Sequence, residues 1–205
     1  TIEPDGDEHP IRTIGIFDGT NPDPPTIVDV VEPADIRRDV DVGDSSVLNV
    51  YGGRITATEN GIEAFDESVV NFFSGEVIGV HEASGAYGNS TINVYEGLFR
   101  GHSVEAEAAG TINIFGGAFE TQIYTSEVAQ VHIHGGSISR LEIAETSWIT
   151  VYGTGFNYPY GPIPDDAGVL TGVLSDGQPI NAEFRIDRTF SEDVSVVLAV
   201  PESST

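Results

Sequence analysis

Hydrophobic and polar residues alternate in a short segment that recurs six times along the chain. Each copy places one polar residue, usually Asn, between two apolar residues, and an aromatic residue and a glycine-rich corner usually follow. The copies are Val47-Leu-Asn-Val-Tyr-Gly-Gly53, Val69-Val-Asn-Phe-Phe-Ser-Gly75, Thr91-Ile-Asn-Val-Tyr-Glu-Gly97, Thr111-Ile-Asn-Ile-Phe-Gly-Gly117, Gln130-Val-His-Ile-His-Gly-Gly136 and Trp148-Ile-Thr-Val-Tyr-Gly-Thr154. Their polar positions are 18 to 22 residues apart. A period of that length, with one strand in each unit, predicts a solenoid.

The alternation also predicts which side chains face the core, because successive side chains on a strand point to opposite faces. The residues on either side of the polar position are apolar in all six copies, so they form one inward column. A second column follows the corner, at Ile55, Val77, Phe99, Phe119, Ile138 and Phe156. A third, weaker face includes Ile62/Ala64, Val80, Val104/Ala106, Ile123 and Leu141/Ile143. Three short faces in about 20 residues fit one coil of a parallel β-helix, and crossover connections favour the right-handed form.

The start of the chain differs from the repeat region. Residues 1–25 are predicted to be an extended acidic and Pro-rich segment, with a strand at 13–17 that could add to an adjacent subunit. Residues 26–31 look like a degenerate first coil in which Asp29 takes the polar position, and residues 35–43 complete this coil. With this coil, the β-helix is expected to span residues 26–156 with about seven coils.

Past residue 156 the period fails, and three strands are predicted at 169–174, 180–186 and 194–200. The residues Ser175-Asp-Gly-Gln178 are a hairpin signal between the first two. Residues 157–205 are therefore expected to form an antiparallel C-terminal β cap and tail. The fold class that follows is an all-β, single-domain, right-handed parallel β-helix with this cap.

The outward column of the first face is the strongest candidate for a functional surface. It places a row of polar residues beside a row of rings, on strands that stack at about 4.8 Å. The candidate residues are Asn49, Tyr51, Asn71, Phe73, Asn93, Tyr95, Asn113, Phe115, His132, His134 and Tyr152. Three interpretations stay open. Similar residues on adjacent strands could stack only to stabilise the sheet, another protein surface could cover the apolar stripe, or the stripe could be a glycan-binding platform.

Composition excludes several classes of partner. The formal net charge is −25, and all eight basic residues are Arg. Such a chain is not expected to bind nucleic acid or an anionic membrane surface, because it cannot neutralise phosphates in quantity. The sequence has no long apolar run, so no membrane insertion is expected, and it has no Cys that could form a disulfide.

Enzymes with a parallel β-helix fold would need clustered carboxylates or a basic residue beside a bound cation. The third face offers Glu63, His81, Glu82, Glu105, Glu107, Glu142 and Glu145. These residues do not keep one phase from coil to coil, and isolated carboxylates that alternate with Val or Ala are typical of a solvated strand. We therefore expect no catalytic residues, with a polysaccharide lyase or hydrolase as a second alternative function.

Metal binding is predicted to be weak at most. His132 and His134 are two residues apart on one strand and could share a metal, but no third ligand accompanies them. Acidic clusters at 5–8, 39–44, 165–166 and 192–193 match no complete Ca²⁺ loop. We expect no cofactor and no metal site beyond weak Ca²⁺ binding.

A family resemblance rests on the C-terminal residues. The run Gly168-Val-Leu-Thr-Gly-Val-Leu-Ser-Asp-Gly-Gln-Pro-Ile180, the later Phe184-Arg185 and the ending Val200-Pro-Glu-Ser-Ser-Thr205 resemble secreted bacterial β-helix proteins with a PEP-CTERM sorting signal. The Asn-Val-Tyr-Gly-Gly repeats are similar to the same group, although Ser203 stands where the signal has a second proline. The resemblance implies export, removal of a C-terminal anchor near the Pro-Glu motif, and delivery to the cell surface or extracellular matrix.

These observations predict an extracellular structural protein of the surface or matrix that self-assembles into filaments or arrays. The expected partners are other copies of the chain and, in the alternative, an extracellular polysaccharide. That alternative is a glycan-binding module in which the outward rings stack on sugars and the Asn side chains bind hydroxyls.

Overall fold

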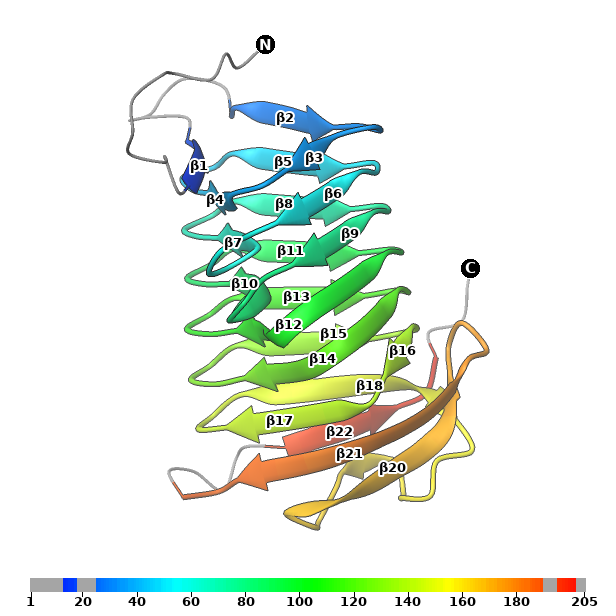
Figure 1. The fold of residues 1–205 in the computed structure, drawn as a ribbon. Coiled ribbons are helices and arrows are strands. Elements are labelled where there is room, and N and C mark those ends of the chain that lie inside the picture. Colours follow the sequence, from blue (N-terminus) through cyan, green and yellow to red (C-terminus); the bar gives the residue numbers. More distant parts are fainter. Residues whose placement is uncertain (1–12, 18–24, 190–194, 202–205) are drawn as a thin grey trace, which may run out of the picture.

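The computed structural model describes residues 13–17, 25–189 and 195–201, which form strands and connections without a helix. The strands stack into a parallel β-solenoid of about six turns, which confirms the fold class predicted from the repeat (Figure 1). In Figure 1 the chain runs to the right along the rear strands, returns to the left along the front strands and descends with each turn, so the coil is right-handed.

The rear wall of the solenoid is a ladder of short strands that keep one register. Asn49 pairs with Asn71, Asn71 with Asn93 and Asn93 with Asn113. Asp29 pairs with Asn49, as expected for the degenerate first coil. The strands of this ladder are β2 (Ile27–Val30), β5 (Val47–Val50), β8 (Val69–Phe72), β11 (Thr91–Val94), β13 (Thr111–Ile114), β15 (Gln130–Ile133), β18 (Trp148–Thr154) and β22 (Ser195–Ala199).

The front wall carries the second and third faces, which belong to one bent sheet. Two of its strands, β12 (Leu98–Ala106) and β14 (Ala118–Thr125), run through both faces. The second face also contains β3 (Asp35–Ile36), β6 (Arg54–Thr56), β9 (Glu76–Ile78) and β16 (Ser137–Ile138). The third face also contains β1 (Thr13–Ile16), β4 (Asp39–Val42), β7 (Ile62–Ala64), β10 (Glu82–Ala86) and β17 (Arg140–Ala144).

The core lies between the walls and is built from the predicted inward columns, except that Phe156, which was predicted to face the core in the second column, is only partly buried. The apolar residues that flank the ladder position are almost completely buried in the coils from β5 to β18, and so are Ile55, Val77 and Phe99 of the second face. The rings of Phe72 and Phe99 lie 4.8 Å apart inside the solenoid, and those of Phe99 and Phe119 lie 5.1 Å apart. Burial of these side chains is the main favourable contribution to stability.

In the coils that begin at Asn49, Asn71, Asn93, Asn113 and His132, the variation in repeat length lies between the second and third faces. The second-face residue of these coils comes six positions after the ladder residue, as Ile55 follows Asn49. In the first coil, Ile36 comes seven positions after Asp29. In the longer coils an extra loop follows that face, and between β9 and β10 this loop contains Val80. The prediction that Val80 faces the core is wrong: its exposed fraction is 64%, and Ala83, Ser84 and Ala86 of β10 are buried instead.

The two ends of the solenoid are built differently. At the first end, β1 pairs in parallel with β4 of the same chain, and addition of residues 13–17 to an adjacent subunit stays a prediction. At the other end, β20 (Ala167–Leu174) and β21 (Pro179–Asp187) form the predicted antiparallel hairpin.

The cap also extends both walls. β21 pairs in parallel with β17, and β22 pairs in parallel with β18, so each ladder gains one more rung from the cap. β19 (Gly161–Pro162) adds an antiparallel bridge to β22. The cap is thus antiparallel only where β20 and β19 pair.

Candidate functional site

The outward rings of the rear ladder form one continuous stack. Tyr51 and Phe73 have centroids 4.9 Å apart with 3° between their planes, and Phe73 and Tyr95 lie 5.0 Å apart at 8°. The stack continues through Phe115, which lies 5.2 Å from Tyr95. His134 follows, with its ring centroid 5.2 Å from that of Phe115, and Tyr152 ends the stack at 4.1 Å from His134. The predicted column of rings is therefore present from Tyr51 to Tyr152.

The orientation of these rings limits what the stack can bind. Because consecutive planes are nearly parallel, each internal ring has a neighbour over both of its faces. The partly exposed area of Tyr95 and Phe115 therefore belongs to the ring edges and not to the faces. Sugars that stack on aromatic side chains need an open ring face, and in this stack only the outer faces of the two end rings could provide one. The ladder is thus a poor platform for stacking sugars along its length.

The amide side chains beside the rings are also paired with one another. Asn113 Nδ2 donates to Asn93 Oδ1, Asn93 Nδ2 to Asn71 Oδ1, and Asn71 Nδ2 to Asn49 Oδ1, each at 2.9 Å. The row ends where Asn49 Nδ2 donates to the carboxylate of Asp29, also at 2.9 Å. Each internal amide thus uses one donor and one acceptor within the row, which favours a role in holding the coils together.

The two histidines occupy ladder positions and do not form a separate site. His132 lies in the amide row and pairs with Asn113 across the sheet, while His134 lies in the ring stack. The Tyr152 hydroxyl and Nδ1 of His132 are 3.4 Å apart. Burial lowers the pKa of His132, which favours its neutral form near pH 7.

A second candidate surface lies on the third face of the front wall, and it corrects the sequence interpretation. Asp41 pairs with Glu63 across β4 and β7, and Glu63 pairs with Gly85. The same column continues through Glu105, Tyr124, Glu142 and Arg185. The prediction that the carboxylates of this face keep no common phase is therefore wrong for Glu63, Glu105 and Glu142.

The phase is hidden only when residues are counted forward from the ladder. Counted backward, Glu63 lies eight residues before Asn71, Glu105 eight before Asn113, and Glu142 eight before Thr150. The variable loops fall outside this interval, so the backward count would have identified the column. We call the outward residues Asp41, Glu63, Gly85, Glu105, Tyr124, Glu142 and Arg185 the acidic column.

At Gly85 the acidic column has no side chain of its own, and Tyr87 fills the gap. An ideal Cβ on Gly85 would lie 2.6 Å from the Tyr87 hydroxyl oxygen. This hydroxyl donates a short hydrogen bond to the carboxylate of Glu82. Burial raises the pKa of Glu82 to about 7 despite that hydrogen bond, and the charges of Glu105 and Glu63 contribute to the rise.

Other carboxyl groups of the third face also have raised pKa values. Burial raises the pKa values of Asp41, Glu63 and Glu107, and in each case a neighbouring carboxylate adds to the effect. Protonated carboxyls are therefore favoured here more than at an ordinary surface. On the second face, Arg54 and Arg100 share the carboxylate of Glu76.

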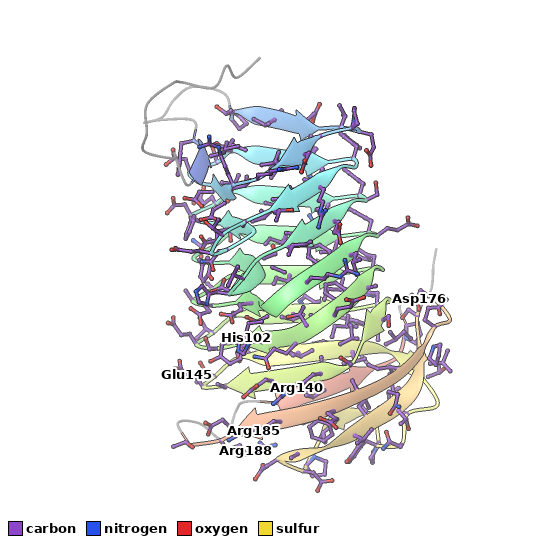
Figure 2. The ribbon with its side chains drawn as sticks, viewed as in Figure 1. His102, Arg140, Glu145, Asp176, Arg185 and Arg188 are labelled. Atoms are coloured by element: carbon purple, nitrogen blue, oxygen red, sulfur yellow. The ribbon has the colours of Figure 1, made fainter. Side chains whose placement is uncertain are left out.

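The front wall has a depression beside the lower half of the acidic column. Its volume is about 360 Å³. Its lining consists of polar side chains from β12, β14 and β17, and Figure 2 shows two of them, His102 and Arg140, on this side of the solenoid. The lining residues are His102, Glu105, Gln122, Tyr124, Arg140 and Glu142.

The described residues contain neither a metal-binding cluster nor a membrane-spanning helix. Within residues 13–17, 25–189 and 195–201, no group of three His, Asp or Glu side chains is arranged to hold a metal ion. The acidic clusters at 5–8 and 192–193 lie outside these residues. In the same part of the chain, no helix is long and apolar enough to cross a membrane.

Comparisons with known proteins identify no related family or structure. No protein-family model, curated protein or solved structure matches the chain significantly. What can be said of its function therefore depends on the fold and on the surfaces described above.

Proposed function

We propose that the protein is an extracellular structural β-solenoid of the cell surface or matrix that self-associates through its ends. The observation that supports this most is that the outward rings and amides of the rear wall are paired with one another from coil to coil. Such ladders stiffen the solenoid and occupy one donor and one acceptor of each internal amide. The resemblance to PEP-CTERM proteins supports a location at the cell surface or in the extracellular matrix.

Exposed apolar side chains at both ends support association through the ends. At the first coil, Ile27 has an exposed fraction of 63%, and Val31 and Phe17 are exposed as well. At the cap, Val169 and Val173 of β20 are exposed. Open solenoid ends present apolar surface and unpaired backbone groups, which favour addition of another chain unless they are covered.

The edge of β20 is partly blocked against strand addition. Asn157 Nδ2 donates to the Val169 carbonyl at 2.8 Å, and the Thr171 amide donates to Asn157 Oδ1 at 2.7 Å. The Asn157 amide also donates to the Thr171 carbonyl at 3.1 Å. Contacts at the cap would therefore use side chains, whereas the first coil would use both its apolar residues and the outer edge of β2.

Electron microscopy and sedimentation velocity over a range of concentrations, with and without millimolar Ca²⁺, test this proposal. The double variant Ile27→Glu/Val31→Glu should abolish filaments or arrays, because it places two charges at the first coil. The control Val80→Glu/Val128→Glu adds the same charges at exposed corner residues in the middle of the solenoid and should leave assembly intact. Monomers of the unmodified chain under every condition would refute self-association.

A further inference from the structure

The depression on the front wall differs from both ladders in the chemistry that it presents. On the rear wall, rings stack on rings and amides on amides. The lining of the depression combines donors with acceptors: Arg140 and Gln122 carry N–H groups, and Glu105 and Glu142 carry carboxylates. Its volume of about 360 Å³ lies within the range of small-molecule sites, roughly 300–1,000 Å³.

The backbone places the polar groups of the depression around the ring of Tyr124. Glu105 and Glu142 occupy the rungs on either side of Tyr124 in the acidic column, so their backbones are about 10 Å apart at two rungs of about 4.8 Å each. Arg140 is two residues before Glu142 on β17 and forms an ion pair with it at 3.8 Å. A β-bulge between Arg100 and Ser103 of β12 shifts the register at the edge where His102 lies.

From this arrangement we infer that the depression is a binding subsite for a neutral, hydroxyl-rich saccharide. A sugar hydroxyl both donates and accepts, so it can bridge a carboxylate and a guanidinium or amide group that lie side by side. The carboxylates of Glu105 and Glu142 accept from such hydroxyls, while Arg140 and Gln122 donate to them. Tyr124 lies between them and offers its ring and its hydroxyl.

The charge of the molecule selects against other ligands. A net charge of −25, together with Glu107 and Glu145 near Tyr124, repels nucleic acids and acidic glycans. A purely apolar ligand would take water away from the carboxylates and Arg140 without offering them hydrogen bonds, which is unfavourable. The subsite is also distinct from the ring stack, which lies on the opposite wall, and it does not depend on self-association.

Affinity electrophoresis tests the inference with a panel of soluble polysaccharides. The neutral members are hydroxyethylcellulose, mixed-linkage β-glucan, arabinoxylan, galactomannan and dextran, and the acidic members are polygalacturonate and alginate. We expect at least one neutral glycan to slow migration of the full chain and no acidic glycan to do so. Retention by none of the neutral glycans, or by the acidic ones alone, would overturn the inference.

Variants then locate the site. Arg140→Ala and Gln122→Ala should each weaken binding of the retained glycan by about tenfold or more, as expected for losing a charged or amide partner. Arg54→Ala controls for the loss of one positive charge, and Tyr95→Ser/Phe115→Ser controls for the ring stack; both should leave binding unchanged. Circular dichroism and thermal unfolding verify that each variant is folded. Binding that survives both Arg140→Ala and Gln122→Ala, or that is lost only in the ring-stack variant, would place the site elsewhere.

Discussion

Glu82 provides a sharp test of the electrostatics of the front wall. Its carboxylate accepts a hydrogen bond from Tyr87, and burial raises its pKa from 4.5 to about 7. A carboxyl whose pKa is raised by folding holds its proton in the native state at pH values where the unfolded chain has released it. The free energy of unfolding therefore falls as pH rises from about 4.5 to about 7, and the Glu82 contribution is most favourable below that interval.

The size of this effect follows from the two pKa values. A rise from 4.5 to about 7 corresponds to about 3 kcal/mol if the whole difference acts on stability. Because Glu82 is only half-buried, solvent screening reduces this to about 1–2 kcal/mol. Substitution Glu82→Gln removes the titration and keeps an oxygen that can accept from Tyr87. At pH 7.5 the variant should therefore be more stable than the unmodified chain by about 1–2 kcal/mol.

Thermal unfolding at pH 4.5 and pH 7.5 measures the difference. For a chain of this size, 1 kcal/mol corresponds to about 2–4 °C in Tm. Glu96→Gln, at an exposed corner residue, controls for the loss of one negative charge from a strongly acidic protein. The Tm gain of Glu82→Gln over Glu96→Gln should appear at pH 7.5 and shrink at pH 4.5. An equal effect of the two variants at pH 7.5, or a gain that does not change with pH, would refute the reasoning.

Three further predictions concern the amide row, a corner and the cap. Asn93→Ala removes two bonds of the amide row and Asn113→Ala removes one, so chemical denaturation should give losses of about 1–3 and about 0.5–1.5 kcal/mol, respectively. Ala108 has a φ of 55°, so Ala108→Gly should raise the free energy of unfolding by about 0.5–1 kcal/mol, whereas Ala109→Gly, where φ is not positive, should lower it. Asn157→Ala should unblock the edge of β20 and increase self-association in sedimentation velocity; unchanged sedimentation would show that Asn157 does not protect this edge.

The walls of the solenoid could be predicted because local alternation determines them. Leu48 and Val50 flank a polar residue, and so do their counterparts in each coil, so one pattern repeated at a nearly constant period defines both the rung and its inward face. The same logic identified the degenerate coil at Asp29, where the sequence is least similar to the consensus.

The features that were missed depend on long-range geometry. Loops of variable length hid the acidic column from the sequence pattern. Val80 is apolar and was assigned to the core, but it lies in one of these loops and is exposed. Alternation placed Tyr95 and Phe115 in one column but could not determine the angle between their planes. The depression beside Arg140 is also lined by side chains of β12 and β14, which no local pattern near Arg140 indicates.

The partners of the cap strands could not be predicted for a similar reason. The hairpin signal at 175–178 identified the antiparallel pair β20 and β21. The parallel pairing of β21 with β17 joins Arg140 to Glu183, residues that are far apart in the sequence and share no repeat. Such pairings are selected by the shape of the end of the solenoid and by burial of residues such as Phe184.

The two walls differ in a way that bears on where ligands should be sought. On the rear wall each outward side chain finds a like neighbour one rung away and gains from it. On the front wall the same spacing brings like charges together, which destabilises the fold, and the acidic column is interrupted by Tyr87 over Gly85 and by Tyr124. Natural sequences retain such locally unfavourable arrangements mainly where they serve a function. The front wall, with its raised carboxyl pKa values and its depression, is therefore the surface on which binding should be tested first.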